Sequence, residues 1–148
     1  MDKKDIKYIE MCESLTELSD DPKTGVASII VKEDNIISYG VNELPFRSNK
    51  LKDRCESPGK DKWMLHAERN AIYKAARSGV SLVGTKMYCT YFPCADCARG
   101  IVQSGIEKLI TNKPDFNHHK WGESWLEAMI ILKECGVSVV WANQDKNE

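Results

Sequence analysis

The chain has 148 residues, and its 21 lysines and arginines nearly balance 22 aspartates and glutamates, for a net charge of −1. This length predicts one domain over residues 1–148 with its own hydrophobic core. The balanced charge argues against a nucleic-acid partner, which usually requires a basic excess. The charged N-terminus lacks the apolar segment of a signal peptide, and no apolar run is long enough to span a bilayer. We therefore expect a cytoplasmic protein, with no membrane partner, in a compartment that keeps thiols reduced.

The first part of the chain predicts a helix and a hairpin. Apolar residues at helical spacing indicate a helix over residues 4–18, which ends at the Asp-Asp-Pro sequence 20–22. β-branched residues over 26–32 and 36–42 indicate two strands joined in a hairpin. Residues 43–62 have no such pattern, and a loop of this length in a compact domain is usually functional.

The second part of the chain alternates helices and strands. Helices are predicted over 63–79, from Pro93 onward and over 123–136, and strands over 86–91, 108–111 and 137–141. Because helical crossovers join the last three strands, these strands should run parallel. The order predicts an α/β fold with three α-β-α layers and a mixed five-stranded sheet.

Two short clusters contain residue types that bind metals, HAE at 66–68 and PCADC at 93–97. The CxxC spacing alone fits a structural zinc site, a redox pair or a catalytic metal site. A structural zinc normally has four protein ligands, whereas His66, Cys94 and Cys97 supply three and leave one position open. We expect all three in the first turns of two helices, where a helix N-terminus favours the thiolate form of cysteine.

Glu68 gives the open metal position a chemical use. Zinc lowers the pKa of a bound water to about 7. A carboxylate two residues beyond His66 can take the proton from this water and pass it to a leaving group. Neither a redox pair nor a purely structural zinc site explains this carboxylate.

The pattern H-x-E followed by P-C-x-x-C is typical of zinc-dependent nucleobase deaminases, and the chain resembles the cytidine and deoxycytidylate deaminase superfamily over about residues 5–141. The resemblance is carried by HAERNAI (66–72), MYCTYFPCADCARGIVQSGI (87–106) and YGVNELP (39–45), and FPCADCARGIVQSGI is most similar to the deoxycytidylate branch. It implies Zn²⁺ on His66, Cys94 and Cys97, Glu68 as proton shuttle, and hydrolysis of a free deoxycytidine nucleotide, dCMP, to dUMP and ammonia.

The resemblance also implies substrate contacts. Asn42 matches the family asparagine that contacts the sugar, although Val41 and Glu43 replace the usual Tyr and Gly. Ala67 and Pro93, inside the two signature motifs, are further candidate substrate contacts.

The loop FNHHKWGESW, residues 116–125, has two open interpretations. It could close over the substrate, with His118, His119 and Lys120 facing a phosphate and an aromatic residue covering the base. It could equally be a polar connection whose tryptophans pack on the last helix. Arg47 and Lys50 in the earlier loop are rival phosphate partners.

Three alternatives share the fold or the metal site: a tRNA adenosine deaminase, a guanine deaminase and a catalytically silent, zinc-stabilised binding module. The neutral charge and PCADC argue against the first, and Glu68 argues against the last. Relatives of this kind often form hexamers, so we expect a homo-oligomer, with the hexamer as the leading state. Residues 46–62 contain Cys55 but no histidine, so we predict no second zinc site, and we expect Trp63 to lie in the core.

Overall fold

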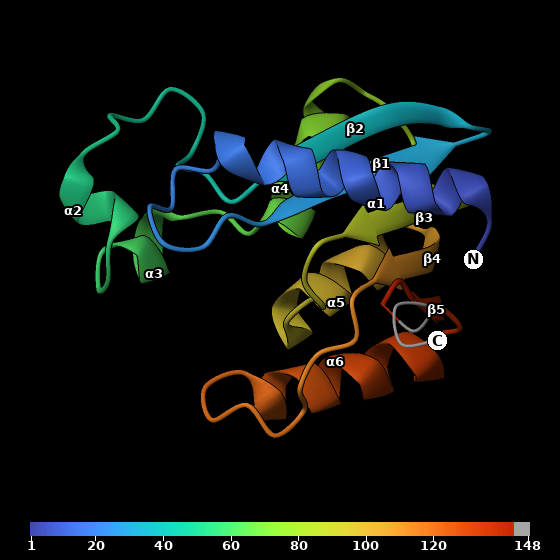
Figure 1. Cartoon of the computed structure of the whole chain (residues 1–148). Coiled ribbons are helices and arrows are strands. Elements are labelled where there is room, and N and C mark those ends of the chain that lie inside the picture. Colours follow the sequence, from blue (N-terminus) through green and yellow to red (C-terminus); the bar gives the residue numbers. More distant parts are fainter. Residues whose placement is uncertain (144–148) are drawn as a thin grey trace.

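The computed structural model describes residues 1–143. Its centre is a five-stranded sheet in the order β2-β1-β3-β4-β5 (Figure 1). The strands are β1 (Ala27–Lys32), β2 (Asn35–Val41), β3 (Thr85–Cys89), β4 (Ile106–Thr111) and β5 (Ser138–Trp141). β1 pairs antiparallel with β2 and β3, whereas β3, β4 and β5 run parallel. The predicted mixed sheet with parallel last strands is confirmed.

Helix α1 (Lys3–Leu15) covers one face of this sheet, and α4 (Ala67–Arg77), α5 (Ala95–Gln103) and α6 (Gly122–Glu134) cover the other (Figure 1). The 3₁₀ helix η1 (Thr16–Leu18) follows α1, and the short helices α2 (Lys52–Cys55) and α3 (Lys60–Trp63) lie to one side of the sheet. No helix within residues 1–143 is both long and apolar enough to cross a membrane.

Alternating side chains of the central strands build two cores, as expected for a sheet that is covered on both faces. Ile30, Met87 and Leu109 belong to the core that is packed by α4, α5 and α6. Their neighbours in the sequence, among them Ile29 and Tyr88, face the other way and pack beneath α1. The three-layer α-β-α arrangement predicted from the sequence is thereby confirmed.

A buried carboxylate attaches α1 to the sheet. Asp5 is 4% exposed and accepts a hydrogen bond of 2.7 Å from the Tyr88 hydroxyl. It also accepts a bond from the backbone N–H of Asp2 in a capping box. Burial raises the pKa of Asp5, but these hydrogen bonds outweigh it and hold the pKa below the ordinary value of 3.8. The carboxylate is therefore ionised at neutral pH and satisfied by its partners.

The helix predicted over 63–79 was placed too early, because α4 begins at Ala67. Met64 and His66 have extended backbones, with ψ of 122° and 147°, which interrupt the helix after α3. The backbone N–H of Leu65 instead donates to the carbonyl of Glu43 at 2.8 Å. The predicted loop also contains α2 and α3, and Trp63, expected in the core, is 39% exposed beneath the Arg54 guanidinium.

Close backbone contact between β2 and α4 depends on Gly40. A Cβ atom at this position would lie 2.5 Å from the Ala67 carbonyl oxygen and 2.5 Å from the Ala71 nitrogen. Since both atoms belong to the backbone, the helix itself would have to move. Gly40 therefore sets how closely the start of α4, which carries HAE, approaches the sheet.

We predict that Gly40→Ala lowers the free energy of unfolding by about 1–3 kcal/mol, as overpacking of a tight contact does. Gly100→Ala is the matched control. Gly100 lies within α5, and a Cβ atom there would meet Ile72 Cδ1 at 3.6 Å, an ordinary van der Waals distance. The control should be neutral or gain up to about 1 kcal/mol from helix propensity. Urea unfolding of both variants measures the difference, and equal stabilities would contradict the tight contact.

Candidate active site

The N-termini of α4 and α5 bring three metal-binding side chains to one point. His66 is the N-cap residue of α4, and Cys94 is the N-cap residue of α5. We expected all three residues in first helical turns, but only Cys97 lies in one. His66 and Cys94 each lie one residue before the helix begins. His66 Nδ1 lies 3.5 Å from Cys94 Sγ and 3.6 Å from Cys97 Sγ.

These separations fit a tetrahedral zinc ion. Zinc bonds of about 2.0–2.3 Å to nitrogen and sulfur place neighbouring ligand atoms about 3.3–3.8 Å apart. Within residues 1–143, the ligand atoms of His66, Cys94 and Cys97 form a group in which all lie within 4.8 Å of one another. One nitrogen and two sulfurs are zinc donors, and a set of three leaves the fourth position open.

Hydrogen bonds prepare Cys94 as a thiolate. The pKa of the Cys94 thiol falls to about 4, mainly because the Cys97 thiol donates to it and also because His66 and the Cys97 backbone N–H point at its sulfur. For the same reason the pKa of Cys97 rises. The bond to Cys94 raises the pKa of His66 as well. Both groups therefore hold a proton more tightly than usual, and zinc competes with that proton for the ligand atom, so zinc affinity falls as the pH falls.

Glu68 lies in the first turn of α4 and is 4% exposed. Burial raises its pKa above the ordinary value of 4.5, although the charge of His66 acts in the opposite direction. A carboxyl group with a raised pKa is a better proton acceptor than an ordinary carboxylate, as a general acid–base requires. Two residues further on, Asn70 donates from its Nδ2 to the Val41 carbonyl and fixes this turn of α4 against β2.

Arg69 is a site residue that sequence reasoning missed. Its guanidinium forms an ion pair with Asp96 and so joins α4 to α5. Burial acts to lower the pKa of Arg69, but the neighbouring Cys97 sulfur and the Asp96 carboxylate raise it. The buried Nε has no hydrogen-bond partner. The position of Arg69 directly after HAE in the sequence is the feature from which its place in the site could have been predicted.

The loop after β4 reaches the same site. The Trp121 ring meets the His66 imidazole edge-on, with centroids 6.2 Å apart. Near the start of α6, Ser124 Oγ accepts a 2.9 Å hydrogen bond from the backbone N–H of Ala95, the residue after Cys94. Trp121, in the loop for which the sequence left both a packing role and closure over the substrate open, therefore lies beside a predicted metal ligand.

The neighbouring basic residues differ in their surroundings. His118 Nδ1 accepts from the backbone N–H groups of Lys120 and Trp121 at 3.1 and 3.2 Å. The His119 ring stacks on His118 at 4.7 Å. The ammonium of Lys120 lies 5.3 Å from the centre of the Trp121 ring. Contact of these residues with a phosphate stays a prediction.

Asn42 uses its side chain within the protein. Its Oδ1 accepts from the Val26 N–H and the Ser19 hydroxyl, and its Nδ2 donates to the Thr24 carbonyl. It is thus the residue that folds the segment before β1 against the end of β2. Contact of Asn42 with a sugar stays a prediction, as do the roles of the buried Ala67 and Pro93 beside the metal-binding residues.

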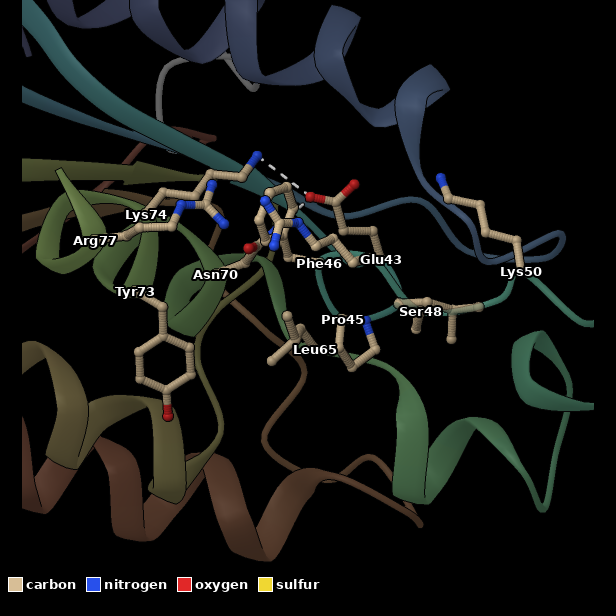
Figure 2. Close-up of a pocket in the computed structure, with 12 residues that line it drawn as sticks. Glu43, Pro45, Phe46, Ser48, Lys50, Leu65, Asn70, Tyr73, Lys74 and Arg77 are labelled. Carbon is tan, nitrogen blue, oxygen red and sulfur yellow. Dashed lines mark hydrogen bonds and ion pairs between the residues drawn. The ribbon is translucent and has the colours of Figure 1, made fainter.

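A cavity of about 370 Å³ lies between α4 and the loop after β2, and its lining contains none of the three metal-binding residues or Glu68 (Figure 2). Glu43 is central to it, because its Oε1 accepts from Asn70 at 2.8 Å and pairs with Lys74 at 3.2 Å. Arg47 and Lys50 line this cavity. Lys50 pairs with Asp20 at 2.9 Å, and Arg47 lies 4.9 Å from the centre of the Phe46 ring.

The chain is similar in sequence to known proteins over most of its length. The profile of the "cytidine and deoxycytidylate deaminase zinc-binding region" matches residues 2–113. An uncharacterized deaminase in the luxG 3′ region of Aliivibrio fischeri is 35% identical over 141 residues, which cover 94% of this chain and 93% of that protein. The deoxycytidylate deaminase of Enterobacteria phage T2 is 38% identical over 104 residues, which cover 70% of this chain and 51% of the phage protein.

Solved structures agree with the sequence matches. The dCMP deaminase of cyanophage S-TIM5 in apo form superposes with a TM-score of 0.75 at 28% identity, over 95% of this chain and 99% of that one. The structure of the same enzyme in complex with dCMP and dUMP has a TM-score of 0.74 at 29% identity, over 94% and 97% of the two chains. The zinc-binding profile and the His/Cys/Cys geometry together identify Zn²⁺ as the ion that the site fits.

We predict about one zinc ion per purified chain and its loss in Cys94→Ser, because an alcohol is a poor substitute for the thiolate that zinc prefers. Cys135→Ser is the matched control, since Cys135 is an exposed free thiol. Plasma mass spectrometry after gel filtration gives the ratio of metal to protein. Equal zinc contents in the two variants would contradict the ligand assignment.

Proposed function

Because the chain belongs to the cytidine and deoxycytidylate deaminase family, we propose that it catalyses the hydrolytic deamination of dCMP to dUMP and ammonia. The single observation that carries this proposal is a carboxylate, Glu68, buried within one turn of a three-ligand metal site. A silent, zinc-stabilised binding module has no need for such a buried acid. The relatives described as deoxycytidylate deaminases support dCMP over a tRNA adenosine or a purine base.

The residues of the chain divide the chemistry between them. His66, Cys94 and Cys97 would hold the zinc ion, which when bound supplies Lewis-acid activation of water for attack on C4 of the pyrimidine. Glu68 accepts a proton from the attacking water, holds it in the buried site, and delivers it to the departing amino group. The reaction balances, because water and the cytosine ring yield the uracil ring and ammonia.

The environment of Glu68 suits this exchange. A fully exposed carboxylate would lose its proton too readily to return it to the leaving group. Burial raises the pKa of Glu68 above its ordinary value, while a hydrogen bond from its own backbone N–H and the charge of His66 limit the shift. The same burial excludes bulk water, which strengthens electrostatic interactions with the charge that develops on the ring.

We predict that Glu68→Gln keeps zinc and fold but lowers kcat for dCMP by at least about 10²-fold, the lower end of typical general acid–base contributions. Glutamine keeps the shape of the side chain but cannot carry the proton. Glu127→Gln is the control, since Glu127 is exposed on α6. Ammonia release measures turnover, and a Glu68→Gln variant with most of its activity would show that another residue moves the proton.

The surroundings of the candidate phosphate partners favour the loop after β4. Lys120 lies against Trp121, which contacts the His66 ring, so Lys120 is connected to the metal site through one side chain. Lys50 instead pairs with Asp20 and lines the separate cavity. We therefore infer that His119 and Lys120, both exposed, meet the 5′-phosphate.

We predict that dCMP has a kcat/KM at least about 10-fold above that of deoxycytidine, because a cationic site for a phosphate rejects the analogue without it. Lys120→Ala should raise KM for dCMP and leave deoxycytidine kinetics unchanged. Lys50→Ala tests the rival loop in the same assay. Equal kcat/KM for the two substrates would indicate a nucleoside or base deaminase instead. A larger rise in KM for dCMP in Lys50→Ala than in Lys120→Ala would assign the phosphate contact to the loop after β2.

Assembly and location stay predictions. Leu126 and Ile130, one turn apart on α6, are 50% and 55% exposed, and such an apolar pair is consistent with the predicted homo-oligomer. The hexamer and the cytoplasmic location rest on the sequence analysis alone.

A further inference from the structure

We propose that Glu43 is a positioning residue, which holds both ends of the segment that carries His66 and Glu68 and thereby places Glu68 for proton transfer. This inference rests on the proposed function, because it gives Glu43 a part in the same reaction. Glu43 is one of the two residues of the YGVNELP stretch that depart from the family motif, which has a glycine at this position. A glycine could supply the backbone carbonyl but not the carboxylate.

The backbone of Glu43 fixes the first end of the segment. Its carbonyl accepts a hydrogen bond of 2.8 Å from the backbone N–H of Leu65. Leu65 directly precedes His66, the N-cap residue of α4, so this bond sets where the chain enters the helix. The bond uses main-chain atoms alone, and it would form with any side chain at position 43.

The side chain of Glu43 fixes the second end. Its Oε1 accepts a hydrogen bond of 2.8 Å from Nδ2 of Asn70, whose backbone N–H donates to the His66 carbonyl at 2.9 Å (Figure 2). Asn70 is 4% exposed, and its Nδ2 also donates to the Val41 carbonyl. Residues 66–69 therefore lie between two hydrogen bonds to the same residue, one from each side.

A lysine of the same helix holds the carboxylate toward α4. The ammonium of Lys74 pairs with Glu43 Oε1 at 3.2 Å and lies 4.5 Å from the centre of the Tyr39 ring on β2. The side chains of Glu43 and Lys74 are only 25% and 26% exposed, so their attraction is less screened than that of a pair in open solvent. The Glu43 carboxylate is thus placed by a charge as well as by the Asn70 amide.

The loss of this clamp should affect Glu68 more than His66. A bound zinc ion would hold the His66 ring through its own bond to nitrogen. Glu68 is no metal ligand, and its place in the buried site depends on the backbone of the first turn of α4. A misplacement of about 1 Å can lower a rate by about 10²-fold. We therefore expect kcat to change, with little effect on zinc content or KM.

Hydrogen–deuterium exchange of the zinc-loaded protein tests the clamp without a substrate. Glu43→Ala should raise exchange of the amides in residues 65–71 by about 10-fold or more, because a hydrogen bond to a charged group is lost. Exchange in α6 should not change. Glu43→Gln keeps an acceptor for Asn70 and should stay within about threefold of the wild type. Glu10→Ala, which removes an exposed acid from α1, is the control. Unchanged exchange in Glu43→Ala would overturn the clamp.

Kinetics with dCMP, normalised to bound zinc, test the link to Glu68. Glu43→Ala should lower kcat by about 10-fold with less than about a twofold change in KM, and Glu43→Gln should restore most of kcat. In the Glu68→Gln background, Glu43→Ala should lower the residual turnover by less than about twofold, because the clamp acts through Glu68. The same loss factor in both backgrounds, or an unchanged kcat in Glu43→Ala, would overturn the positioning role.

The outcomes separate this inference from the proposed function. A wild-type protein that deaminates dCMP, while Glu43→Ala keeps wild-type exchange and kcat, overturns the clamp alone. A zinc-loaded wild-type protein that does not deaminate dCMP overturns the proposed function and with it the role in proton transfer, and the exchange rates still decide whether Glu43 holds the segment. If Glu43→Ala fails to fold, Glu43→Met fills similar space without an acceptor, and wild-type exchange in that variant overturns the clamp.

Discussion

The convergence of two helix N-termini on one point is the constraint on which the rest of the structure depends. His66 and Cys94 cap α4 and α5, and their side chains approach within 3.5 Å. Helix N-termini carry partial positive charge, which stabilises thiolates and favours anionic groups nearby. The metal site is therefore built from local backbone geometry and needs no long flexible loop to assemble it.

The sheet determines where these helix ends meet. Parallel pairing of β3, β4 and β5 sends each connecting segment out at the same edge, so α5 and α6 begin close together. The hairpin of β1 and β2 brings Gly40 against α4, and the missing side chain lets the helix backbone approach. Glu68 lies in the first turn of the same helix, is buried, and has a pKa raised by that burial.

Sequence patterns predicted the parts of the molecule that depend on local order. Strand-like segments indicated all five strands, and helical periodicity indicated the helices between them. The spacing of HAE and PCADC indicated the metal-binding set. The start of α4 was misplaced because the extended backbone at Met64 and His66 depends on a hydrogen bond between Leu65 and the distant Glu43. The contact of Trp121 with His66 was missed because it joins two segments that only the folded sheet brings together.

X-ray absorption spectroscopy at the zinc edge of the purified protein tests the central claim, a three-ligand zinc site with one open position. The account predicts two sulfur neighbours at about 2.3 Å and two nitrogen or oxygen neighbours at about 2.0–2.1 Å, one from His66 and one from a non-protein ligand. A dUMP-bound sample should change the nitrogen and oxygen shell and leave the sulfur shell unaltered. A spectrum with three or four sulfur neighbours, or one unaffected by any nucleotide, would indicate a closed structural site and contradict the account.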